Sequence, residues 1–177
     1  IALGGSLARV NLSTTLQGPG AHDALNGLFA PLGTQHLDAH TWIDHAAPHT
    51  TSDENYRGIA GERGRGVFNG KVIVRPDAQK TDARQSSRNL LLTAGAEIDT
   101  KPELEIYAND VKCSHGPTTR QLDAPALFYL RSRGLDEATA RALLIRAFAE
   151  SIVTSIGPPA VRSHLEQLLN ERYKVIS

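Results

Sequence analysis

The sequence predicts a mainly β fold, in which a parallel β-solenoid over residues 1–121 precedes a three-helix region over residues 122–177. Two observations lead to this prediction. Strand-like runs recur without helical segments between them, and the periodicity becomes helical after the last run. Apolar residues make up 40% of the chain, which is enough for a core and excludes wholesale disorder. Because the chain has only four Phe, four Tyr and one Trp, that core is expected to be mostly aliphatic.

The strand signal is clearest in the middle of the chain. Residues 103–108 alternate between polar and apolar side chains, which is the period of two of a β-strand. Two further strand-like runs centre near Val72 and Leu91. A crossover helix would be needed in each gap of a βαβ fold, whereas stacked coils need none, so the spacing favours a solenoid. Before residue 66 the patterns are weaker, and the best candidate strand there is residues 36–45.

Helical signals begin after Leu122. Asp123 and Asp136 are suitable N-caps for a first and a second helix, and Gly134 suits the residue after the end of the first. The apolar residues of the second helix share one face; they are Ile145, Phe148, Ile152 and Ile156. Gly157-Pro158-Pro159 is expected to end this helix. A third helix is expected to carry one apolar stripe of Val161, Leu165, Leu169 and Tyr173.

Composition excludes several classes of protein. Basic and acidic side chains balance at 19 each, so no overall field attracts nucleic acid or an anionic membrane. No apolar run reaches the length of about 18 residues that a membrane span needs. The N-terminus lacks a signal-peptide pattern, and a cytoplasmic location is therefore expected. A single cysteine excludes an internal disulfide framework and a Cys-rich zinc module.

The only cysteine lies in the segment Lys112-Cys113-Ser114-His115-Gly116. If a strand continues through this segment, Cys113 and His115 point to the same face, about 6.6 Å apart along the backbone. Thiolate and imidazole are ligands that iron and zinc accept, although a buried free cysteine beside a surface histidine fits the same spacing. Iron–sulfur clusters typically need four protein ligands and tetrahedral zinc three or four, so further ligands would come from elsewhere in this chain or from another chain.

A second group of possible metal ligands lies upstream. It comprises His36, Asp38, His40, Asp44, His45 and His49. In a strand the first three would share a face, which raises the alternative of a metal-dependent hydrolase. The spacing matches neither H-x-H-x-D-H nor H-E-x-x-H, and hydrogen bonding within turns accounts equally for such a group.

Motifs spread over roughly residues 36–150 closely resemble the SufB/SufD family of iron–sulfur cluster assembly proteins. They are DHAAPH (44–49), RGVFNGK (65–71), AQKTDA (78–83), NLLL (89–92), TKPELEI (100–106), DVKCSHG (110–116) and LFYLRSRG (127–134). Within the family the last strand motif is similar to SufD, because the SufB version has Glu where this chain has Gly116. The chain departs from the family pattern at Pro117, where Ala is usual, and at Arg120, where Gly is usual.

The resemblance implies a right-handed parallel β-helix followed by a helical C-terminal domain. It implies a non-catalytic scaffold subunit, not an enzyme. Such a subunit pairs with a SufB-like subunit through β-helix edges and binds a SufC-like ABC-type ATPase through its helical domain. His115 and Cys113 would then be candidate ligands of a transient iron–sulfur cluster shared with the partner, with no cofactor expected in the isolated chain.

Two further expectations follow. The chain begins with Ile1 and contains no Met, so it is expected to be a fragment, and the resemblance implies that it is the C-terminal piece of a longer SufD-like protein. Exposed β-helix edges favour association, so the chain alone can pair with itself as a homodimer.

Overall fold

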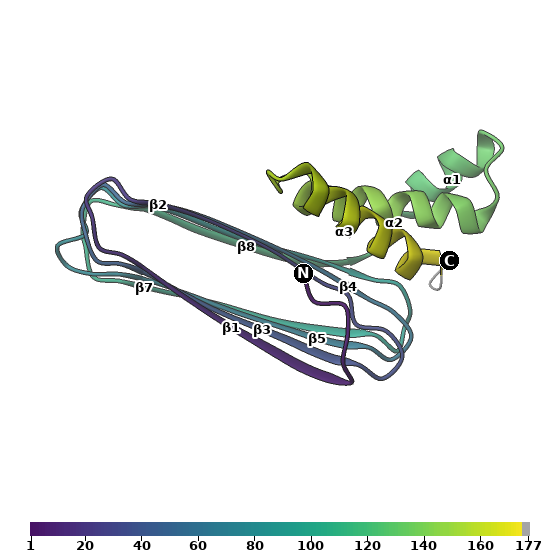
Figure 1. Cartoon of the computed structure of the whole chain (residues 1–177), viewed down its shortest axis with the longest axis horizontal. Coiled ribbons are helices and arrows are strands. Elements are labelled where there is room, and N and C mark those ends of the chain that lie inside the picture. Colours follow the sequence, from purple (N-terminus) through teal and green to yellow (C-terminus); the bar gives the residue numbers. More distant parts are fainter. Residues whose placement is uncertain (175–177) are drawn as a thin grey trace.

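The computed structural model describes residues 1–174. Its eight parallel strands form four coils, and each coil contributes one strand to each of two facing sheets (Figure 1). The odd sheet has the order β1-β3-β5-β7 and the even sheet the order β2-β4-β6-β8. The predicted β-solenoid is thereby confirmed. The strands are β1 (Leu7–Leu16), β2 (His22–Phe29), β3 (His36–His45), β4 (Thr51–Ala60), β5 (Arg65–Val74), β6 (Asp82–Leu91), β7 (Glu97–Ile106) and β8 (Lys112–Gln121).

The coils are stacked in register. Each residue pairs with the equivalent residue of the next coil, 29 to 32 positions further along the chain. Because side chains alternate along a strand, one set points between the two sheets and the other points to the outside. On β5 the inward set includes Phe68 and Val72, which are almost fully buried. The core therefore fills the narrow space between the sheets.

Glycines keep that space narrow at one position. The ring of Phe29 lies between Gly58 of the even sheet and Gly66 of the odd sheet. A Cβ at Gly58 would lie 2.7 Å from this ring, and a Cβ at Gly66 would lie 2.5 Å from it. Both distances are shorter than van der Waals contact, so a larger residue at either position would force the sheets apart.

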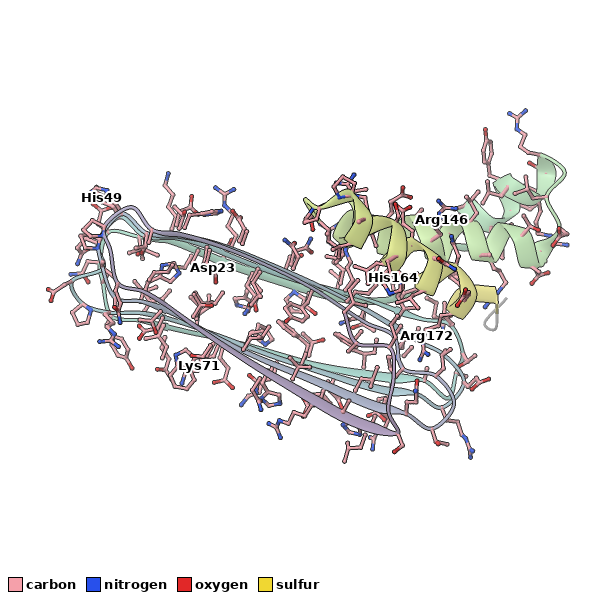
Figure 2. All side chains as sticks on the ribbon, viewed as in Figure 1. Asp23, His49, Lys71, Arg146, His164 and Arg172 are labelled. Atoms are coloured by element: carbon pink, nitrogen blue, oxygen red, sulfur yellow. The ribbon has the colours of Figure 1, made fainter. Side chains whose placement is uncertain are left out.

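The turns between strands also repeat from coil to coil. His49 and Lys80 take positive φ angles of 59° and 63° at equivalent turns, where the preceding coil has Gly20 at 76°. The amide of His49 donates to the carbonyl of Gln79 at 2.8 Å, which ties one turn to the next. His49, labelled at this end of the solenoid in Figure 2, lies in this turn and belongs to no group of three or more possible metal ligands among the described residues.

Three helices follow the last strand: α1 (Ala124–Ser132), α2 (Glu137–Val153) and α3 (Pro159–Lys174). Asp123 and Asp136 cap α1 and α2, as the sequence predicts, and their carboxylates accept the amides of Ala126 and Thr139. The prediction for the end of α2 is wrong: the helix stops at Val153, so Ile156 lies outside it. None of the described helices has the length and hydropathy needed to cross a bilayer.

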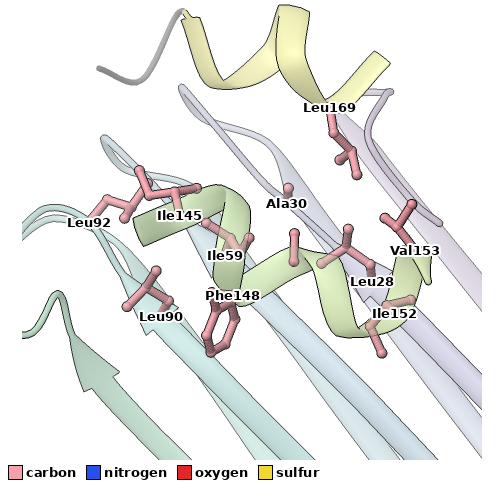
Figure 3. Close-up of a cluster of buried hydrophobic side chains, with 11 residues drawn as sticks. Leu28, Ala30, Ile59, Leu90, Leu92, Ile145, Phe148, Ile152, Val153 and Leu169 are labelled. Atoms are coloured by element: carbon pink, nitrogen blue, oxygen red, sulfur yellow. The ribbon is translucent and has the colours of Figure 1, made fainter. Parts of the chain in front are cut away.

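The helices lie on the outer face of the even sheet near one end of the solenoid (Figures 1 and 3). The predicted face of α2 is buried there, because Ile145, Phe148 and Ile152 pack on outward residues of the sheet such as Ile59 and Leu90. Of the stripe predicted for α3, Leu169 is buried and Val161 is exposed. The side chain of Tyr173 lies outside the described residues.

Candidate functional site

Cys113 and His115 lie on β8, the edge strand of the even sheet. Cys113 pairs with Ala83, and His115 pairs with Gln85. Both partners are buried inward residues of β6, so Cys113 and His115 belong to the inward rows at the open edge of the last coil. Cys113 is half-buried and His115 is exposed. The two side chains therefore share a face that a further strand or a partner chain can reach.

The thiol of Cys113 is shielded by the core. It packs against a cluster that includes Val72, Val74 and Ala83. Burial raises the pKa of the Cys113 thiol, the charge of Asp82 adds to the rise, and a backbone hydrogen bond at Ala83 opposes it. The thiol is consequently protonated near neutral pH. A metal that binds it has to displace this proton, so the thiol is a conditional ligand.

A buried polar pair lies behind His115 in the same inward row. The row runs from Glu54 on β4 through Gln85 on β6 to His115 on β8. Gln85 Nε2 donates to Glu54 Oε2 at 2.6 Å, and Glu54 is only 2% exposed. Burial raises the pKa of Glu54, whereas hydrogen bonding from Thr41 and Gln85 opposes the rise. The amide oxygen of Gln85, Oε1, is buried without a hydrogen-bond partner.

Glu54 and Gln85 are residues that sequence reasoning missed. Glu54 stands in a polar segment that resembles a solvent-exposed stretch, and only the strand register places it inside. The interior of the solenoid is therefore polar on the side that leads to His115.

In the part of the chain that the structure describes, no third candidate ligand lies beside Cys113 and His115. Within the described residues, no group of three or more His, Cys, Asp or Glu side chains is placed to hold a metal ion. Cys113 and His115 thus provide two ligands where an iron–sulfur cluster typically takes four.

The upstream His/Asp group is divided between separate partners. His36, Asp38 and His40 do share the outward face of β3, as the sequence predicts. Asp38 contacts His40 Nε2 at 2.8 Å and Arg9 Nε at 3.4 Å. Asp44 is held by Arg75, with Nη2 2.6 Å from Oδ2.

His45 points to the opposite face and is fully buried, with 0% exposure. Thr50 donates its hydroxyl to the carbonyl of Ala47, so it accepts from Nδ1 of His45 at 2.8 Å. Burial lowers the pKa of His45, so the imidazole is neutral near pH 7, and with Nδ1 as the donor its Nε2 accepts from the hydroxyl of Ser52 at 2.9 Å. The metal-dependent hydrolase alternative is not supported, because His45 faces the opposite side of β3 and Asp38 and Asp44 are each paired with an arginine.

This arrangement predicts a pH dependence of stability. Burial lowers the pKa of His45 below its ordinary value of 6.5, and Asp44 and Asp23 only partly offset this. Between the lowered pKa of His45 in the folded chain and its ordinary value of 6.5, the unfolded chain binds a proton that the folded chain does not. The free energy of unfolding therefore falls as the pH decreases below 6.5. Denaturant unfolding at pH 8 and pH 5.5 measures the effect.

The control is His45→Gln, which keeps hydrogen-bonding atoms but does not titrate. Glu54, whose raised pKa acts in the opposite direction, is unchanged in both proteins. The difference in pH slope therefore isolates His45. Equal slopes for the two proteins would show that His45 is not the group that titrates.

Two in-register parallel sheets with a helical region against one outer face define this chain as a β-solenoid protein. A family model described as "SUF system FeS cluster assembly, SufBD core domain" matches residues 1–148. Because this match covers most of the chain, the chain belongs to the SufBD family, and the resemblance in its motifs is confirmed.

Individual relatives agree. The iron–sulfur cluster assembly protein SufD of Escherichia coli (strain K12) is 38% identical over 170 residues, covering 96% of this chain and 40% of the relative. The SufBD family protein slr0076 of Synechocystis is 42% identical over 97% of this chain and 38% of the relative. The chloroplastic protein ABCI7 of Arabidopsis thaliana is 36% identical over 96% of this chain and 37% of the relative. The chain thus spans well under half the length of these relatives.

Proposed function

We propose that this chain belongs to a cytoplasmic, non-catalytic scaffold subunit of a SufBCD-type iron–sulfur cluster assembly complex. The observation that carries the proposal is the placement of Cys113 and His115 side by side in the inward rows of an edge strand. In this proposal they supply two ligands to a nascent cluster, and a SufB-like partner supplies the others. His115 is the stronger ligand, because a neutral imidazole can bind metal directly. The shielded thiol of Cys113 must first lose its proton.

The partner surface in this proposal is the open edge formed by β7 and β8. Edge strands have unpaired backbone N–H and C=O groups, which form a template for a strand from another chain. Pro102 and Pro117 lie on these two strands, and both are tolerated because edge strands do not need every backbone donor. A SufB-like solenoid that adds at this edge would cover Cys113 and His115 and complete the ligand set. The same edge would allow a homodimer when the partner is missing.

The helical region is the proposed docking surface for a SufC-like ABC-type ATPase. No residue of α1 is buried. Its aromatic side chains are exposed, with Phe128 at 74% and Tyr129 at 57%. Exposed aromatic residues on adjacent positions are typical of protein interfaces. ATP hydrolysis would then take place on the partner and not on this chain.

Protection of the only cysteine of this chain tests the shared-site proposal. The full-length protein is alkylated alone, with its SufB-like partner, and with its SufC-like partner, at one fixed pH so that the raised thiol pKa affects all samples equally. We expect the peptide that contains Cys113 to be modified at least tenfold more slowly in the SufB-like complex than in the other two samples. Equal rates in a complex shown to have formed would contradict a partner surface at β8.

A further inference from the structure

Three arginines gather on the outer face of the even sheet, at the border of the area covered by α2. Arg57 on β4 and Arg88 on β6 are ladder partners. Arg120 lies on β8, two residues beyond Thr118, the ladder partner of Arg88. The three occupy successive strands, so they form a contiguous group, here called the arginine cluster.

The aromatic ring of Phe148 ties this cluster to the helices. The guanidinium carbon of Arg57 lies 4.9 Å from the centre of the Phe148 ring, and that of Arg120 lies 6.0 Å from the same centre. Phe148 projects from α2 toward the strands (Figure 3). Two cations therefore flank one ring at the junction of the solenoid and the helical region.

Among the residues that the structure describes, the arginine cluster has no acidic partner. Within the described residues, the guanidinium groups of Arg57, Arg88 and Arg120 take part in no side-chain hydrogen bond or ion pair. Nε of Arg57 is buried without a hydrogen-bond partner. Burial lowers the pKa of Arg57, and the charges of Arg88 and Arg120 lower it further.

Other arginines of the solenoid are arranged differently. Each of four has a carboxylate partner on its own or a neighbouring strand; these are Arg9 with Asp38, Arg65 with Glu97, Arg75 with Asp44, and Arg84 with Asp82. The arginine cluster thus departs from the pairing that holds at four other positions of the same fold.

Like charges placed together without a counter-charge repel one another, and contact with one ring offsets little of this. A cation–π contact is worth about 0.5–1 kcal/mol at an exposed site and about 2 kcal/mol when desolvated. Guanidinium groups, by contrast, donate several hydrogen bonds in a planar array that fits the oxygens of a phosphate group. The geometry points to a binding site for a phosphate group, held by Arg57, Arg88 and Arg120 against α2, and this site is separate from Cys113 and His115.

The test uses the purified full-length protein at low chloride, titrated with inorganic phosphate and, in a second arm, with pyrophosphate. Calorimetry and thermal unfolding are expected to give saturable binding at one site and a rise in Tm. Saturable binding of phosphate would show that the site recognises a single phosphate group. Tighter binding of pyrophosphate would show that its preferred ligand is a polyphosphate. Failure of both ligands to saturate would overturn the inference.

Two variants and a control assign the binding to the cluster. Arg88→Gln and Arg120→Gln are each expected to weaken phosphate binding at least tenfold, and both side chains are exposed, so the fold is retained. Each variant is also expected to raise Tm without phosphate, because it removes a repelling charge. The control is Arg84→Gln on the same strand as Arg88, whose partner is Asp82, and its phosphate affinity is expected to be unchanged. An equal loss of affinity in the control would show that binding reflects general positive charge.

Discussion

Replacing Phe68 by alanine is expected to lower the free energy of unfolding by about 3–5 kcal/mol. Phe68 is 0% exposed and lies on β5, in an inner coil of the solenoid. Its ring stacks on that of Tyr56 from the facing sheet, with centroids 4.4 Å apart and an angle of 26°. Neighbouring coils hold both backbones in register, so the surrounding core cannot collapse into the cavity that the substitution leaves.

Denaturant unfolding followed by circular dichroism and by fluorescence of Trp42 measures this loss. Two probes are needed because repeat folds can unfold in parts, and only coincident transitions give a defined free energy. The matched control is Val67→Ala, the adjacent outward position of the same strand, where the side chain is half-buried. We expect the control to cost about 1 kcal/mol or less. Equal losses at both positions would contradict the assignment of inward and outward faces.

The strands from β5 onward were partly predictable because their apolar residues alternate. Val72 and Val74 point inward on β5, and the pattern shows it directly. The strand near Leu91 was placed wrongly, because β6 runs from Asp82 to Leu91 and the apolar run marks its end and not its centre. The inward residues of this strand include Gln85 and Asn89, which are buried but polar and therefore give no apolar signal.

The early coils were hidden from sequence reasoning for the same reason. On β4 the inward positions hold Ser52, Glu54 and Tyr56, so the alternation of the strand is not an alternation of hydropathy. The register that places them inside comes from neighbouring coils about 30 residues away, and no local pattern contains that information. Helix starts were easier, because Asp123 and Asp136 act through their own local hydrogen bonds.

The candidate site was likewise predictable only where it depends on local sequence patterns. A shared face for Cys113 and His115 follows from strand periodicity alone, and the structure places both in inward rows of β8. The pair Glu54 and Gln85 behind His115 and the arginine cluster depend on contacts between coils, which the sequence does not reveal.

Replacing His115 by alanine is expected to remove the cluster from the assembled complex without preventing assembly. His115 is exposed, and its side chain makes none of the side-chain hydrogen bonds found among the described residues. Its loss should therefore change the free energy of unfolding by about 0.5 kcal/mol or less. The loss of one ligand from a shared site, by contrast, leaves the cluster without a full set of protein donors. His164→Ala, an exposed histidine on α3, is the matched control (Figure 2).

Iron and acid-labile sulfide per complex test the central claim most directly. The full-length protein, its His115→Ala variant and its His164→Ala variant are each co-expressed with SufB-like and SufC-like partners and purified without oxygen. The account predicts iron and sulfide in the parent and the control, and at least a tenfold loss in a His115→Ala complex of the same subunit composition. Equal iron and sulfide in all three complexes would contradict it, because the ligands would then lie wholly on the partner.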